Sequence, residues 1–143
     1  LVSRALEIAS QNPYAHNIKA HVHREWGAVN RFAAQEDESR RNSLLASARE
    51  HFASAASHYR SAIERTPIDA FKLTYVLSET STLIEDLIPL VDDVAERQWL
   101  IGNAKVALDQ SERWMKGAHK EDTYSQRLQE LETRLDALMN ASE

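Results

Sequence analysis

Residues 52–68 read FASAASHYRSAIERTPI, and this stretch decides the fold class of the chain. Small residues at Ala55 and Ala62 flank an aromatic one at Tyr59, and a proline follows at Pro67. At these spacings the two alanines and the tyrosine lie on one side of a helix, where small side chains let a neighbouring helix approach closely. Because a proline restricts the residue before it, the helix should end just before Pro67. The stretch therefore predicts a tightly packed helix within an all-α fold.

Outward from this stretch, apolar residues recur at helical spacing along the rest of the chain. Asn12 and Pro13 supply an N-cap and a first-turn proline, so a helix should begin at residue 13. The expected helical segments are residues 1–10 (the end of a helix), 13–35, 43–65, 67–87, 90–116 and 122–140. Two points stay open: residues 36–42 form either a loop or a helical extension, and Pro89 either ends or kinks a helix.

Composition narrows the class of protein. The 143 residues include 43% apolar and 27% charged residues and only 3 Gly and 3 Pro, which favours a single all-helical domain over residues 1–143. The first residue is Leu1, so we expect a piece of a longer protein. A net charge of −5 argues against nucleic-acid binding, and no apolar run reaches the ~18 residues of a membrane span. The absence of cysteine fits a cytoplasmic location.

The residues Ala55, Tyr59, Ala62 and Pro67 resemble the second helix of a tetratricopeptide repeat. The likeness covers about residues 1–67, and residues 68–143 diverge from it. Upstream, Ala5-Leu6-Glu7-Ile8 before Asn12-Pro13 resembles the end of one repeat, while His23 and Gly27 resemble part of the next first helix. Gly27 and Ala55 are further apart than in a regular repeat, so the helices should be elongated or their loop expanded. The resemblance implies five to seven antiparallel helices, stacked as hairpins in a right-handed tetratricopeptide-like array with a C-terminal capping helix.

In that family the inner face of each first helix lines a groove that binds peptides or protein segments. By register, the matching positions here are Tyr14, Asn17, His21 and Arg24. Their aromatic, amide, imidazole and guanidinium groups suit a peptide backbone or a carboxylate. The resemblance therefore implies a non-enzymatic interaction or sensor module with a protein or peptide partner and no cofactor. A structural spacer without a partner is an alternative.

The last predicted helix carries a leucine repeat. Tyr124, Leu128, Leu131, Leu135 and Leu138 recur at alternating spacings of four and three, which is a heptad seam. The seam could pair between chains and make a homo-oligomer. It could equally pack on the rest of its own domain.

Four histidines raise a metal hypothesis. His16 and His23 are seven residues apart on one predicted helix, and His51 and His58 have the same spacing on the next. Facing one another, they would suit a metal-dependent helical-bundle enzyme. Helical zinc sites usually space their ligands three or four apart, however, and no His-Glu-x-x-His motif is present.

Other catalytic patterns are missing from the sequence. No serine lies in a Gly-x-Ser-x-Gly turn, and no glycine-rich phosphate loop occurs. Adjacent acids such as Glu85 and Asp86 should diverge around a helix into solvent. We expect Trp26, Trp99 and Trp114 in the core or at the edge of a groove. The sequence thus predicts no catalytic, cofactor-binding or metal-binding residue.

Overall fold

The computed structural model describes residues 12–141, and these residues form helices without any strand. The all-α prediction is confirmed. The predicted helical segment over residues 1–10 lies outside the described residues. The elements in chain order are α2 (Pro13–Glu36), η1 (Glu38–Arg40), α3 (Arg41–Arg65), α4 (Asp69–Ser81), η2 (Thr82–Leu87), η3 (Ile88–Leu90), α5 (Val94–Gly117) and α6 (Glu121–Ala141).

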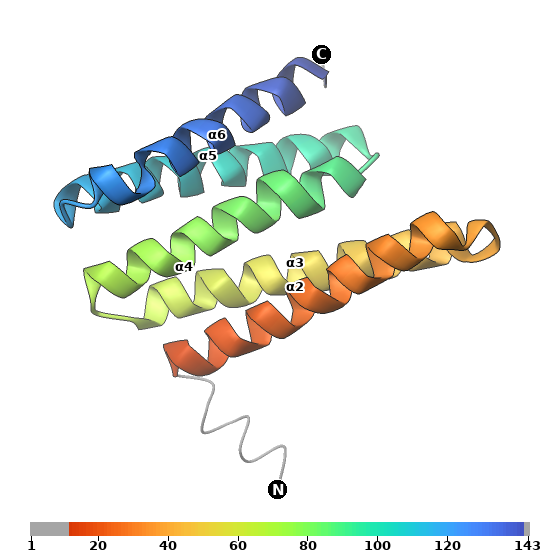
Figure 1. Cartoon of the computed structure of the whole chain (residues 1–143), viewed down its shortest axis with the longest axis horizontal. Coiled ribbons are helices and arrows are strands. Elements are labelled where there is room, and N and C mark those ends of the chain that lie inside the picture. The colour runs from red at the N-terminus through yellow and green to blue at the C-terminus, as the bar shows by residue number, and fades with distance from the viewer. Residues whose placement is uncertain (1–11, 142–143) are drawn as a thin grey trace, which may run out of the picture.

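Each long helix packs against the next one along the chain (Figure 1). The helices run back and forth, with α2 and α6 at opposite edges of the array. The main core lies between α3, the segment from α4 to η3, α5 and α6. The short π-helical element η2 contacts α3, α4, α5 and α6, so it stands at the centre of the packing.

The α2–α3 hairpin is the most extensive pairing in the fold. Asn12 caps α2 by accepting a hydrogen bond from the backbone amide of Tyr14 at 2.9 Å, as its N-cap position predicts. The side of α2 that faces α3 carries Ala20, Gly27 and Ala34, all buried. These small residues let the two helices approach closely, and α3 presents Phe52 to Gly27.

The large apolar residues of α2 lie on the opposite side, and this is the main surprise of the fold. Ile18, Val22, Trp26 and Val29, which the sequence places at helical spacing, are all exposed. Trp26 therefore lies in no core. Small residues and large apolar residues each recur at helical spacing along α2, on opposite sides of the helix. The side with the small residues packs on α3.

The fourth segment continues past α4 through η2 and η3 and ends at Leu90. Pro89 lies in the last 3₁₀ turn, so it ends the helical run, and α5 begins only at Val94. Val76, Leu83, Ile84 and Leu87 are buried in agreement with the periodicity. Phe71 is half exposed, because it lies in the first turn of α4, next to the connection between α3 and α4.

The two remaining connections are short. Residues 36–42 hold the end of α2, the 3₁₀ turn η1 and the start of α3, so they form a tight turn. Gly117 is the last residue of α5, one residue past the predicted end at 116. The left-handed backbone conformation that turns the chain occurs at His119, with φ of 56°. In α6, Leu128, Leu131 and Leu135 are buried in the main core.

Candidate binding groove

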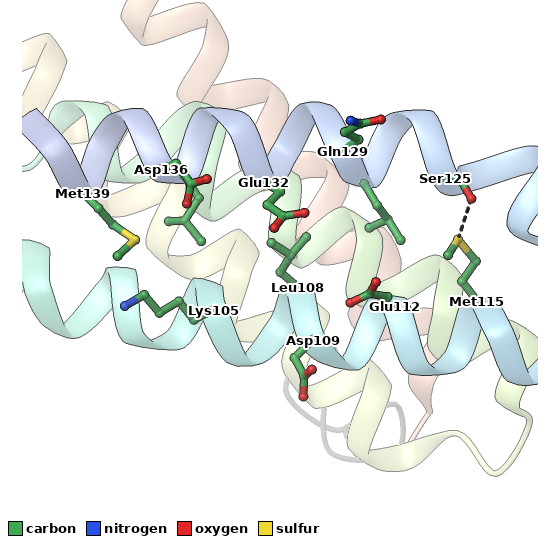
Figure 2. Close-up of a pocket in the computed structure, with 12 residues that line it drawn as sticks. Lys105, Leu108, Asp109, Glu112, Met115, Ser125, Gln129, Glu132, Asp136 and Met139 are labelled. Atoms are coloured by element: carbon green, nitrogen blue, oxygen red, sulfur yellow. Dashed lines mark hydrogen bonds between the residues drawn. The ribbon is translucent and has the colours of Figure 1, made fainter.

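A groove runs between α5 and α6, the last two helices of the array (Figure 2). It encloses about 450 Å³. Each helix contributes residues three and four positions apart, which places them on one side of that helix. The lining residues are Lys105, Leu108, Asp109, Glu112, Met115, Ser125, Leu128, Gln129, Glu132, Leu135, Asp136 and Met139.

The floor of this groove is apolar. Leu108 and Met115 rise from α5, and Met139 descends from α6 (Figure 2). Leu128 and Leu135 of α6 complete the floor and belong to the main core as well. Methionine side chains are flexible and polarizable, so a floor with two of them can adapt to different apolar partners.

The rim of the groove is acidic. Glu112 lies between the two helices, and Glu132 and Asp136 extend from α6 toward α5 (Figure 2). Neither Glu132 nor Asp136 forms an ion pair with any residue that the structure describes. Asp109 points away from α6 and pairs with Arg113. Against these carboxylates the lining carries one cation, Lys105, so the groove has a net negative charge.

A second groove, of about 570 Å³, lies between α3 and α5 over α4. Arg60 donates from Nε to the Glu79 carboxylate at 2.9 Å within it. Burial raises the pKa of Glu79, and the neighbouring Arg60 opposes this shift. Because these two charges satisfy each other, the groove offers a partner mainly the exposed side chains of Trp99 and Val106. Its rim carries a single further acid, Glu64, whereas the α5–α6 groove carries several, so the α5–α6 groove is the candidate site.

The structure places the four predicted groove residues along α2, away from both grooves. Tyr14 is 63% exposed. His21 Nδ1 lies 2.8 Å from the hydroxyl of Tyr59, whose pKa is raised by burial. Arg24 donates from Nε to Asp86 at 2.8 Å. The Oδ1 atom of Asn17 is buried without a hydrogen-bond partner among residues 12–141. Two of the four side chains, His21 and Arg24, are therefore engaged in contacts within the fold.

The partner of Arg24 corrects a prediction about Glu85 and Asp86. These adjacent acids do diverge, but neither extends into solvent. Asp86 is buried and accepts hydrogen bonds from Arg24 and Arg31 of α2. Glu85 pairs with Arg127 and Arg134 of α6. The π-helical turn therefore directs two neighbouring carboxylates to opposite helices, and Arg134 bonds to Glu85 rather than to Glu130 four residues away.

The leucine seam is filled by the chain itself. Leu128, Leu131 and Leu135 are at most 6% exposed, and Leu138 packs against the same core. This side of α6 is therefore occupied within the domain. The packing matches the alternative in which the terminal helix covers its own domain.

The four histidines do come together at the α2–α3 interface. The Nδ1 atoms of His16 and His58 are 3.0 Å apart, and so are those of His23 and His51. A neutral imidazole has one N–H, so each contact requires one nitrogen to donate and the other to accept. The rings of His23 and His58 stack between the two pairs. We call these four residues the histidine ladder.

The histidine ladder is a packing feature with altered proton affinity. Burial lowers the pKa of His23 below its usual range, and His51 adds to the shift. Burial also lowers the pKa of His58, with contributions from His16, His23 and Lys19. Within residues 12–141, no group of three or more His, Cys, Asp or Glu side chains is arranged to hold a metal ion.

Sequence reasoning missed the acidic rim of the groove. Gln129, Glu132 and Asp136 recur at spacings of three and four along one flank of the leucine seam, which is the signal that could have found them. The opposing flank on α5 could be matched to it only once the two helices were known to be neighbours.

The helices of the described part contain none that is both long and apolar enough to cross a membrane.

Comparison of the chain with protein-family models, with curated proteins and with solved structures gave no match.

Proposed function

We propose that this chain is a non-enzymatic protein-interaction module whose α5–α6 groove binds an amphipathic helix carrying lysine or arginine. The observation that carries the proposal is the combination of an apolar floor with an acidic rim that has few internal partners. A helix laid in an apolar groove buries one side, while its flanking cations reach carboxylates.

The binding energy would come mainly from the floor. Burying one leucine-sized side chain contributes about 1.5–3 kcal/mol, so two or three such residues give a useful affinity. Glu132 and Asp136 would act mainly on specificity and on the association rate, because exposed charges attract over a distance and reject like charges. Binding should therefore weaken as salt concentration rises.

A labelled-peptide titration tests this proposal. The probe is an amphipathic helix of leucine and lysine of about 18 residues, roughly 27 Å long. The control peptide has the same sequence with glutamate in place of each lysine. We expect fluorescence anisotropy to detect binding of the lysine peptide and little binding of the glutamate peptide.

Charge-reversal variants locate the binding in the groove. The double variant Glu132→Lys with Asp136→Lys should weaken binding of the lysine peptide about tenfold or more, which corresponds to about 1.4 kcal/mol. The control is Glu50→Lys with Asp92→Lys, which makes the same charge change at exposed positions outside the groove. Equal weakening by both double variants would show only a general charge effect and would reject the groove.

A further inference from the structure

The outer side of α2 carries an unusual number of exposed large apolar residues. Its aromatic members are each more than half exposed, with Trp26 at 57% and Phe32 at 65%. We define the α2 stripe by its residues, which share one side of the helix: Tyr14, Ile18, Val22, Trp26, Val29 and Phe32. Most of this stripe points away from α3, since the buried residues Ala20 and Gly27 lie on the opposite side of the helix. Trp26 lies at its flank, where the indole also meets the His51 ring of α3 edge-on, with 5.1 Å between the ring centroids.

The stripe is at the upper limit of what an ordinary monomer surface exposes. A large aromatic side chain carries about 150–250 Å² of surface, so the six residues together expose on the order of 600 Å². That equals the largest apolar patches of typical monomers. It also approaches the ~800 Å² that each partner buries in a standard stable interface. The area alone thus fits a helix-to-helix interface along the length of α2.

The order of residues within the stripe fits a second copy of the same helix. When one α2 is reversed and laid against another, Tyr14 lies level with Phe32 of the second copy. In the same register Ile18 is one residue (about 1.5 Å) from level with Val29, and Val22 is two residues (about 3 Å) from level with Trp26. Aromatic residues thus meet at the two ends, and the bulky indole meets the smaller valine near the middle. A two-fold interface requires such self-complementarity, because the same surface serves both partners.

Among residues 12–141, no other element packs over the outer side of α2. The helix lies at the edge of the array, where its packing is chiefly with α3 on the other side (Figure 1). Its stripe is separate from the α5–α6 groove at the opposite edge. We propose that two copies of this chain associate through antiparallel α2 helices, with the two-fold axis near residue 23. The pairing is independent of the function proposed for the groove.

Measurement of mass in solution tests the association. The chain of 16.3 kDa should approach twice that mass by light scattering as its concentration rises from about 1 to about 200 µM, a range that covers weak dimers. Val22→Lys with Val29→Lys should keep the chain monomeric. The matched control is Val106→Lys, another exposed valine in a helix outside the stripe. Circular dichroism of each variant verifies the fold, and the substituted positions already face solvent.

Disulfide trapping tests the antiparallel orientation, and the absence of native cysteine makes it clean. Val22→Cys should form a disulfide-linked dimer on mild oxidation, because position 22 lies beside the axis. Tyr14→Cys alone should not, since the two copies of position 14 would be about 27 Å apart. Tyr14→Cys mixed with Phe32→Cys should crosslink. A wild type that stays monomeric throughout, or efficient crosslinking of Tyr14→Cys alone, would overturn the proposal.

Discussion

Gly27 shows how one missing side chain sets the distance between two helices. A Cβ atom at this position would lie 2.6 Å from Cε1 of Phe52, whose ring is fully buried and lies under Arg31. Gly102 is the matched case, because a Cβ there would meet nothing within 4 Å. Both glycines lie inside helices, so helix propensity alone treats them alike.

We therefore predict opposite effects for alanine at these two positions. Gly102→Ala should stabilise the fold by about 0.5–1 kcal/mol through helix propensity. Gly27→Ala has the same benefit, but overpacking against Phe52 costs about 1–3 kcal/mol, so the net change should be destabilising. Urea unfolding of the two variants measures both free energies. A Gly27→Ala protein as stable as Gly102→Ala would mean that α2 and α3 can move apart at little cost.

At the scale of elements, η2 ties the array together. Its adjacent acids bond to helices on opposite sides, since Asp86 accepts from α2 and Glu85 pairs with α6. The contact of Asp86 with Arg24 is largely shielded from solvent, with the carboxylate side chain 10% exposed. In the Asp109–Arg113 pair on α5 both side chains are exposed to solvent, so this pair serves as a comparison.

Asp86→Ala should cost far more stability than Asp109→Ala. Removing a buried partner leaves Arg24 and Arg31 without their carboxylate, and the expected loss is about 1–3 kcal/mol because the arginines are partly exposed. Removal of the exposed pair should cost at most about 0.5 kcal/mol. Urea unfolding of the two variants measures both losses, and the addition of Arg24→Ala and of Arg24→Ala with Asp86→Ala measures the coupling between Arg24 and Asp86. Equal losses in the two single variants would contradict a tying role for η2.

The helices could be predicted from the sequence, but their orientation could not. Periodicity and caps such as Asn12 gave α2 almost to the residue, because both signals are local. Which side of α2 faces inward was ambiguous, since the small residues around Gly27 and the large ones around Val22 both recur at helical spacing. The π turn left no pattern either, so the partners of Glu85 and Asp86 were out of reach. The acidic rim is formed by α5 and α6 together, and the sequence alone does not show that these two helices are neighbours.

At the scale of the whole molecule, the long helices pack mainly in series, and η2 is the element that also contacts helices further along the chain. Each long helix contacts its neighbour in the chain, and α2 lies at one edge with α3 as its main support (Figure 1). The histidine ladder lies within this single interface. A change in the ladder should therefore loosen α2 while leaving the distant α5–α6 pair in place, as expected for arrays held by nearest-neighbour contacts.

Acid should release α2 selectively, and the sign follows from the lowered pKa values of His23 and His58. Histidines with a lowered pKa in the folded state take up protons more readily when unfolded, where the usual pKa is about 6.5. Their neutral pairing therefore contributes fully above this value and is lost as the pH falls through about 6.5 toward the folded pKa values. Hydrogen exchange, corrected for intrinsic rates, should accelerate in α2 between about pH 7.5 and 5.5 and change little in α5 and α6. His23→Asn with His58→Asn should flatten this dependence, whereas His119→Asn, at an exposed turn, should not. Uniform acceleration across all helices would show that the array unfolds as one unit and that the ladder controls no separate step.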